Sequence, residues 1–326
     1  MSMIKTIFTS LFVFICLSVI GQNTYRFSQF NFAKSVYNPA TVAVDANFSV
    51  DLLYRNQWHG VEGSPQTIAF NTAYEIIPSM AVGFNFFNDR IGLHQTNSFS
   101  GMYAYRINFD KRKYLSFGAG LGVDNISWNL NEAFTTQAND PAFSAGYSKF
   151  KFNSSVGIYY RSPRFYVGAS IPQLFQTSLV GPDKGFRPAR FHYMLLSGYY
   201  FEIGREFVLH PSIQVRMTMN APIQGDLVIR GITKNFGISA GYRSENSLIV
   251  GLDYMYAERY RIGYSFNYDV GPLARVKGAS HEIYLGFGLP YYFNGNNIDR
   301  RRYVSNPGGF KRKYKRAAKK QRLPRP

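Results

Sequence analysis

Side chains that could carry out chemistry are few in this sequence of 326 residues. Its five histidines, at positions 59, 94, 192, 210 and 281, show no spacing that would bring two of them and a carboxylate to one metal ion, so we expect no metal and no other cofactor. His59 with Glu62 is the pairing that suits the base of a hydrolase, but a solvated pair in a loop accounts for it more simply. We therefore expect no enzymatic activity.

Basic side chains are concentrated near the C-terminus. Twelve of the 37 Lys and Arg residues fall in residues 300–326, and all 19 acidic residues precede them. Such a run is typical of a disordered tail, but it can also bind anionic lipid head groups or an acidic protein surface, with residues 311–322 forming a basic helix. The candidate partner-binding residues of the tail are Lys311, Arg312, Lys313, Lys315, Arg316, Lys319, Lys320 and Arg322.

The N-terminal end has the pattern of a targeting segment. Lys5 precedes a largely apolar run at residues 7–20, which is too short for a comfortable membrane-spanning helix, and the small residue Gly21 follows it. We predict a signal peptide over residues 1–21. Its removal takes away Cys16, the single cysteine, and export argues against nucleic acid as a partner of the basic tail.

From residue 46 onward, apolar and polar side chains alternate, as a sheet with one apolar and one polar face requires. Tyr260, Ile262 and Tyr264 alternate with Arg261 and Gly263, for example. No later stretch has the ~18 apolar residues of a transmembrane helix, which excludes a helical membrane protein. Fourteen alternating segments begin near Asn47, Thr67, Met80, Thr96, Tyr114, Phe150, Arg164, Arg190, Phe207, Gln224, Phe236, Leu248, Tyr260 and His281.

Short connections between these segments alternate with longer ones. The short ones fall at residues 77–79, 110–113, 162–163, 204–205, 234–235 and 257–259, and the longer ones at 59–64, 89–95, 129–149, 172–189 and 271–280. Outer-membrane barrels have short periplasmic turns and longer outside loops. The sequence therefore predicts an all-β fold: a transmembrane antiparallel β-barrel of about 14 strands over residues 46–293, in the outer membrane, with both termini in the periplasm. A secreted β-sandwich is the alternative, although it would not need so aromatic an apolar face.

Glycines and charges of both signs occupy the face opposite the apolar one. Rows of glycine let another segment approach the wall, so we predict a plugged or narrow barrel rather than an open porin. Residues 22–45 are the expected periplasmic or plug-like segment, and the two long loops at residues 129–149 and 172–189 are the other available fillers. Residues 294–326 are the expected basic periplasmic tail, disordered or helical. The predicted lumen-facing residues are Gly118, Gly120, Gly122, Gly157, Gly168, Gly237 and Gly241, with Asp51, Arg55, Glu75, Arg106, Arg161, Arg216, Arg230, Arg243, Asp253 and Asp269.

Arg55, Gln57 and Trp58 are the candidate partner-binding residues outside the tail, because a strand meets an outer loop there. A structural role is the alternative for two of them. Arg55 could pair inside the lumen, and Trp58 could belong to an aromatic belt at the membrane interface.

Short motifs follow one another in a recognisable order across the whole barrel. They include Asn38-Pro39-Ala40, Arg55-Asn56-Gln57-Trp58-His59-Gly60, Asp140-Pro141-Ala142-Phe143, Pro222-Ile223-Gln224-Gly225-Asp226 and Ser280-His281-Glu282-Ile283. In these motifs the chain resembles the PorP/SprF family of outer-membrane proteins of the type IX secretion and gliding machinery of Bacteroidetes. It departs from the family pattern at residues 41–43, which lack the usual glycine, and in the basic tail beyond the barrel.

The resemblance implies a non-enzymatic component of this machinery, embedded in outer-membrane lipids. Such a component helps export or anchor a secreted surface protein, adhesin-like, and docks to periplasmic lipoprotein or ring components. A passive or ligand-gated outer-membrane channel for small solutes is the alternative function, and conductance separates the two.

Overall fold

A computed structural model describes residues 26–110, 113–130, 147–178, 191–204, 206–218, 221–271, 274 and 278–289. The predicted signal peptide and the basic tail, with its candidate residues from Lys311 to Arg322, lie outside these ranges. Among the described residues, no helix is long and apolar enough to cross a membrane.

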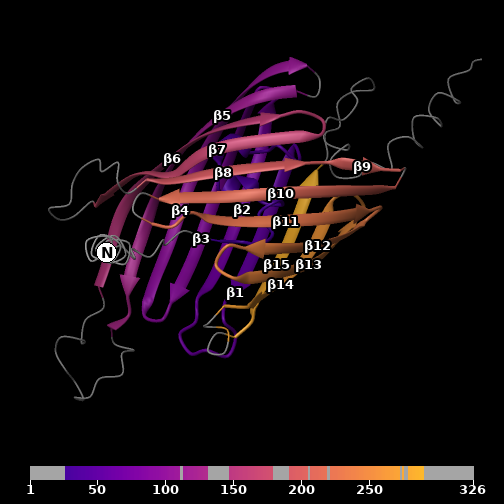
Figure 1. Cartoon of the computed structure of the whole chain (residues 1–326). Helices are drawn as coiled ribbons and strands as arrows, with labels where there is room; N and C mark the ends of the chain where they lie inside the picture. Colours follow the sequence, from indigo (N-terminus) through magenta and orange to yellow (C-terminus); the bar gives the residue numbers. More distant parts are fainter. Residues whose placement is uncertain are drawn as a thin grey trace, which may run out of the picture.

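The described residues form fifteen strands in one sheet, and the pairings between neighbouring strands are antiparallel (Figure 1). Two short 3-10 turns precede the sheet, η1 (Lys34–Val36) and η2 (Pro39–Thr41). The strands are β1 (Phe48–Asn56), β2 (Gln66–Ile77), β3 (Met80–Ile91), β4 (His94–Asp110), β5 (Lys113–Trp128), β6 (Tyr147–Arg161), β7 (Phe165–Ser178), β8 (His192–Tyr199), β9 (Phe201–Ile203), β10 (Phe207–Thr218), β11 (Gln224–Thr233), β12 (Phe236–Arg243), β13 (Ser247–Tyr256), β14 (Tyr260–Asp269) and β15 (Ser280–Leu289).

The sheet closes on itself. Phe48 at the start of β1 pairs with Leu289 at the end of β15, and β11 pairs with both β10 and β12. Because β8 and β9 both pair with β10, on either side of Tyr200, they form one interrupted strand of the wall. The protein is therefore a closed antiparallel barrel of 14 wall strands, as the sequence predicts, and each wall strand begins within three residues of its predicted start.

The barrel wall is apolar outside and polar inside. In β13, Leu248, Val250 and Leu252 point outward and are 46%, 53% and 58% exposed, whereas Ser247 and Asp253 point inward and are buried. Lipid solvates the outer side chains, and the inner ones find polar partners within the barrel. The alternation of period two thus reflects the two environments of each strand.

The two ends of the barrel differ in their connections. We call the end of the barrel where β1 begins and β2 ends the turn rim. The opposite end, where β1 ends and β2 begins, is called the loop rim. The short connections predicted from the sequence all fall on the turn rim.

Residues 26–46, called the lumen segment below, run through the barrel from the loop rim to the turn rim. Arg26 pairs with Glu245 in the connection between β12 and β13, and the amide of Asn47 donates to the carbonyl oxygen of Leu289 at the turn rim. The first and last described residues, Arg26 and Leu289, therefore lie at opposite rims. The chain crosses the lumen once before β1 begins.

Candidate functional site

Aromatic side chains of the lumen segment and the wall pack together inside the barrel. Phe27 and Phe30 of the lumen segment are fully buried there, against a cluster that includes Tyr159 and Tyr166 of the wall. Full burial of a side chain such as Phe stabilises a fold by roughly 1.5–3 kcal/mol. The lumen segment therefore supplies a hydrophobic core in the place where a porin holds water.

At the loop rim, the wall binds the backbone of the lumen segment. Glu282 of β15 is fully buried and accepts hydrogen bonds from the amide nitrogens of Ser28 and Gln29, both at 2.8 Å. Arg55 of β1 donates to the carbonyl oxygen of Arg26. Hydrogen bonds to charged groups are about twice as strong as neutral ones, so these contacts fix the start of the lumen segment.

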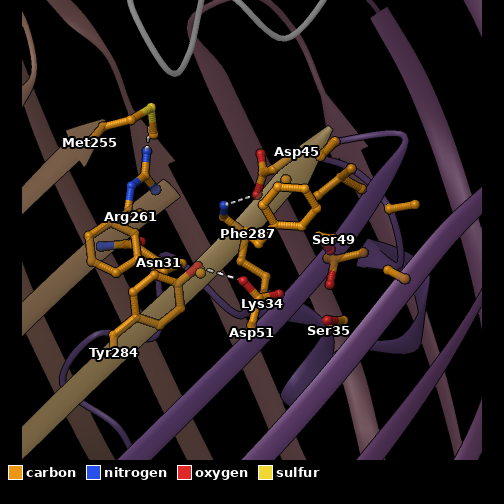
Figure 2. A pocket seen from close by; sticks show the side chains of 18 of the residues that line it. Asn31, Lys34, Ser35, Asp45, Ser49, Asp51, Met255, Arg261, Tyr284 and Phe287 are labelled. Atoms are coloured by element: carbon orange, nitrogen blue, oxygen red, sulfur yellow. Dashed lines mark hydrogen bonds and ion pairs between the residues drawn. The ribbon is translucent and has the colours of Figure 1, made fainter. Parts of the chain in front are cut away.

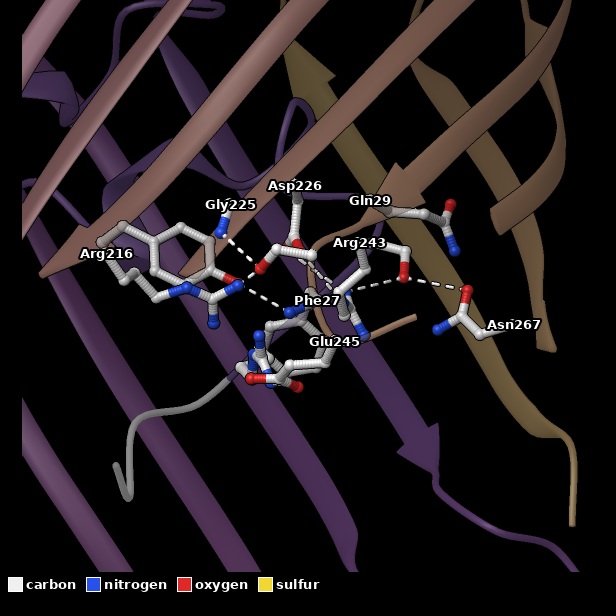
Figure 3. Close-up of polar contacts among 12 residues, drawn as sticks. Phe27, Gln29, Arg216, Gly225, Asp226, Arg243, Glu245 and Asn267 are labelled. Carbon is white, nitrogen blue, oxygen red and sulfur yellow. Dashed lines mark hydrogen bonds and ion pairs between the residues drawn. The ribbon is translucent and has the colours of Figure 1, made fainter. Parts of the chain in front are cut away.

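Asp226 of β11 is the centre of a second set of contacts, drawn in Figure 3. Its carboxylate accepts hydrogen bonds from Nη2 of Arg216 at 2.6 Å and from Nε of Arg243 at 2.8 Å. Arg243 also donates to the hydroxyl of Ser28 at 3.2 Å, and this hydroxyl donates to Asn267 at 3.0 Å. Wall charges that the sequence assigns to the lumen thus bind the lumen segment as well as each other.

Asn38 connects the lumen segment to the middle of the wall. Its side-chain oxygen accepts from the amide of Ala40 at 2.9 Å and so caps η2, which begins at Pro39. Its side-chain nitrogen donates to the carbonyl oxygens of Ile158 on β6 and Ala169 on β7, at 3.0 and 3.3 Å. One asparagine therefore starts a turn and binds two wall strands.

Glycines of the wall make this close approach possible. A Cβ atom on Gly118 would lie 2.1 Å from the backbone nitrogen of Ala40, and one on Gly157 would lie 2.0 Å from Oδ1 of Asn38. Gly168 faces the same asparagine. These three glycines lie against the lumen segment, whereas the other four glycines predicted to face the lumen lie against atoms of the wall itself.

The lumen segment turns toward β1 between Val42 and Ala43. Arg106 of β4 donates to the carbonyl oxygens of both residues, at 2.5 and 2.8 Å, and pairs with the buried carboxylate of Glu75. Ala43 has a φ of 51°, a backbone conformation that favours glycine. The sequence therefore departs from the family pattern at a position where the backbone still has the conformation that glycine adopts most easily.

Asp45 binds two cations near the turn rim. Nζ of Lys34 lies 2.9 Å from Oδ2 of Asp45 (Figure 2), and Nη1 of Arg161 lies 2.9 Å from Oδ1. The three charges fix the lumen segment where it leaves the lumen.

One protein-family model matches most of the chain. The family model described as "Type IX secretion system membrane protein PorP/SprF" matches residues 19–287. The chain belongs to the PorP/SprF family. No curated protein matches the sequence of this family member.

Several solved membrane proteins have a fold similar to that of this PorP/SprF chain. The CymD monoaromatic hydrocarbon channel is 14% identical, with a TM-score of 0.47 over 84% of this chain and 96% of the channel. The Ralstonia pickettii toluene transporter TbuX is 12% identical, with a TM-score of 0.47 over 79% and 93%. The KdgM porin is 9% identical, with a TM-score of 0.38 over 74% and 99%.

The three predicted contact residues of the loop rim differ in burial and in partners in this PorP/SprF chain. Arg55 is 4% exposed and binds the lumen segment, which agrees with its structural alternative. Gln57 and Trp58 lie half-buried in the connection after β1. Their amides donate to the carbonyl oxygen of Pro65 at 2.9 Å and to the hydroxyl of Ser280 at 3.2 Å. Gln57 and Trp58 therefore contribute to the surface of the loop rim, whereas Arg55 does not.

His59 lies beside a second histidine in this PorP/SprF chain. Its ring is 5.5 Å from that of His281, and Nδ2 of Asn56 lies 3.4 Å from its Nδ1. Within the described ranges, no group of three or more His, Cys, Asp or Glu side chains could hold a metal ion.

Glu282 and Asp226 are binding residues that sequence reasoning did not single out. Both belong to motifs that carry the PorP/SprF resemblance, residues 280–283 and 222–226. The motifs marked these positions, but a motif does not say which distant backbone a carboxylate will bind.

Proposed function

We propose that this PorP/SprF chain is a non-enzymatic outer-membrane scaffold of the type IX secretion system. In this role it helps export or anchor a secreted, adhesin-like surface protein and docks to periplasmic components. The observation that carries the proposal is the lumen segment, which fills the barrel with a hydrophobic core and is bound through its backbone near both rims. A filled barrel suits holding a partner better than passing solutes.

The proposal includes an orientation. The turn rim faces the periplasm and the loop rim faces the outside, as in outer-membrane barrels with short periplasmic turns. Leu289 ends β15 at the turn rim, so the basic residues 311–322 follow on the periplasmic side. Arg26 lies at the loop rim, so the mature N-terminus lies near the cell surface.

Each rim has its own partner in this proposal. The tail cations from Lys311 to Arg322 bind an acidic surface of a periplasmic lipoprotein or ring component, because opposite charge attracts partners held near the membrane. The loop rim, with Gln57 and Trp58, contacts the exported client. The exposed apolar side chains of the wall contact outer-membrane lipids.

Deletion of residues 311–326 tests the periplasmic docking. Pull-downs from native membranes, followed by mass spectrometry, should recover fewer periplasmic partners with the truncated chain, while the barrel still inserts. A variant with residues 311–322 in scrambled order keeps the charge and separates electrostatic attraction from recognition of a particular sequence. Equal recovery of periplasmic proteins by the full and truncated chains contradicts docking through the tail.

A passive or ligand-gated channel for small solutes is the second candidate. The observation that favours it is a cavity of about 120 Å³ between the lumen segment and the wall near the turn rim. A channel needs a continuous aqueous path, however, and the lumen segment forms a buried aromatic cluster with the inner face of the wall. Conductance separates the two functions and is discussed below.

A further inference from the structure

The cavity near the turn rim is lined by side chains of both the lumen segment and the wall (Figure 2). Phe32 and Lys34 come from the lumen segment, and Arg230, Arg261 and Tyr284 come from the wall. A single water needs roughly 10–15 Å³ of such space. A cavity of about 120 Å³ therefore has room for a small ion or the end of a larger molecule.

Two cations of the cavity already have carboxylate partners. Lys34 pairs with Asp45 at 2.9 Å. Arg230 donates from Nε to Oδ1 of Asp253 at 2.7 Å, and its guanidinium lies 4.9 Å from the ring centroid of Phe32. These two side chains are therefore neutralised within the protein.

Arg261 of β14 differs from both, because it forms no ion pair with any described residue. Its guanidinium lies over the ring of Phe32, 4.6 Å from the ring centroid, and its Nη2 reaches Sδ of Met255 at 3.9 Å. Its Nε is buried without a hydrogen-bond partner. A thioether sulfur is a weak acceptor, so the donors of Arg261 lack an anion.

Three carboxylates line the cavity, Asp45, Asp51 and Glu258, and none of them forms an ion pair with Arg261. Asp45 binds Lys34 and Arg161, and Asp51 accepts a hydrogen bond from the hydroxyl of Tyr284 at 2.5 Å. The exposed residues Glu258 and Arg259 lie in the turn between β13 and β14 and contribute charges of opposite sign at the edge of the cavity. Arg261 therefore has no carboxylate partner among the described residues, and its free donors suit an anion from outside the chain.

We infer that this cavity binds a small oxyanion, a carboxylate or a phosphate group, on the guanidinium of Arg261. The planar guanidinium matches both groups through paired N–H donors, and its contact with Phe32 holds it in one orientation. The inference does not depend on the export role, because it rests on the cavity and its unpaired arginine alone. A polypeptide C-terminus would supply the carboxylate, and free phosphate or a phosphorylated compound would supply the phosphate.

Calorimetry with the full mature chain in a non-ionic detergent tests this site. The probes are inorganic phosphate, acetate, and one short peptide prepared as the C-terminal acid and as the amide. Arg261→Gln should weaken oxyanion binding about tenfold or more, because a hydrogen bond to a charged group accounts for at least that factor. Lys113→Gln is the matched control, since it removes an exposed cation of the turn rim that does not line the cavity.

Each outcome either tests the proposal or identifies the chemical class of the ligand. Binding of the peptide acid but not of the amide identifies a terminal carboxylate, whereas binding of phosphate alone identifies a phosphate group. Arg261→Lys keeps the charge without the paired donors and should also weaken binding. It provides the test if Arg261→Gln fails to fold. The proposal is overturned if no probe binds, or if the Arg261 variants bind as tightly as the parent chain.

Discussion

At the scale of single residues, the contact between Gly118 and Ala40 sets how closely the lumen segment approaches the wall. Gly118→Ala adds a Cβ atom that would lie 2.1 Å from a backbone nitrogen, so either the segment or the wall must move. We expect a loss of about 1–3 kcal/mol in the free energy of unfolding, the usual cost of overpacking. Limited trypsin digestion should then cleave after Lys34, which is buried in the parent chain.

Gly101→Ala is the control for this substitution. Gly101 lies on β4, and an added Cβ atom there would meet nothing within 4 Å. This variant should unfold and resist trypsin like the parent chain. Equal behaviour of the Gly118 and Gly101 variants would contradict the close contact between the lumen segment and β5.

The face on which a side chain lies could be predicted from the sequence, but its partner could not. Period two placed Arg55 and Arg216 inside the barrel because alternation along a strand fixes the face. It could not tell that Arg216 meets Asp226 across β10 and β11, because this depends on strand register. It also could not pair Glu282 with the backbone of Ser28, which lies at the other end of the sequence.

At the scale of elements, the lumen segment is expected to close the barrel to solutes. The parent chain in planar bilayers should show little steady conductance, and deletion of residues 26–46 should raise it, because the polar inner wall would then face water. Addition of a synthetic peptide of residues 26–46 should lower the conductance again. Deletion of residues 294–326 is the control and should leave it low. Large, steady conductance of the parent chain would favour the channel function.

The presence of a filling segment was predictable, whereas its path was not. The glycines of the wall indicated that a segment approaches it, and residues 22–45 and the two long loops were the available fillers. The composition of residues 22–45 does not predict the direction in which the segment crosses the lumen. Its two turns, η1 and η2, are short and depend on tertiary contacts such as those of Asn38. The sequence therefore could not tell that this segment enters at the loop rim.

At the scale of the whole molecule, the single crossing of the lumen separates the first and last described residues, Arg26 and Leu289. The predicted mature N-terminus at Gln22 lies four residues before Arg26, and four residues span at most about 14 Å. The nine residues of β1 span about 30 Å, so four residues are too few to return from the loop rim to the turn rim. An epitope tag inserted after Asn23 should therefore be labelled on intact cells, and a tag after Pro326 should require permeabilised cells. Labelling of both tags from one side would contradict the path of the lumen segment. If only the tag after Pro326 were labelled on intact cells, the proposed orientation would be inverted, but the path of the lumen segment would still hold.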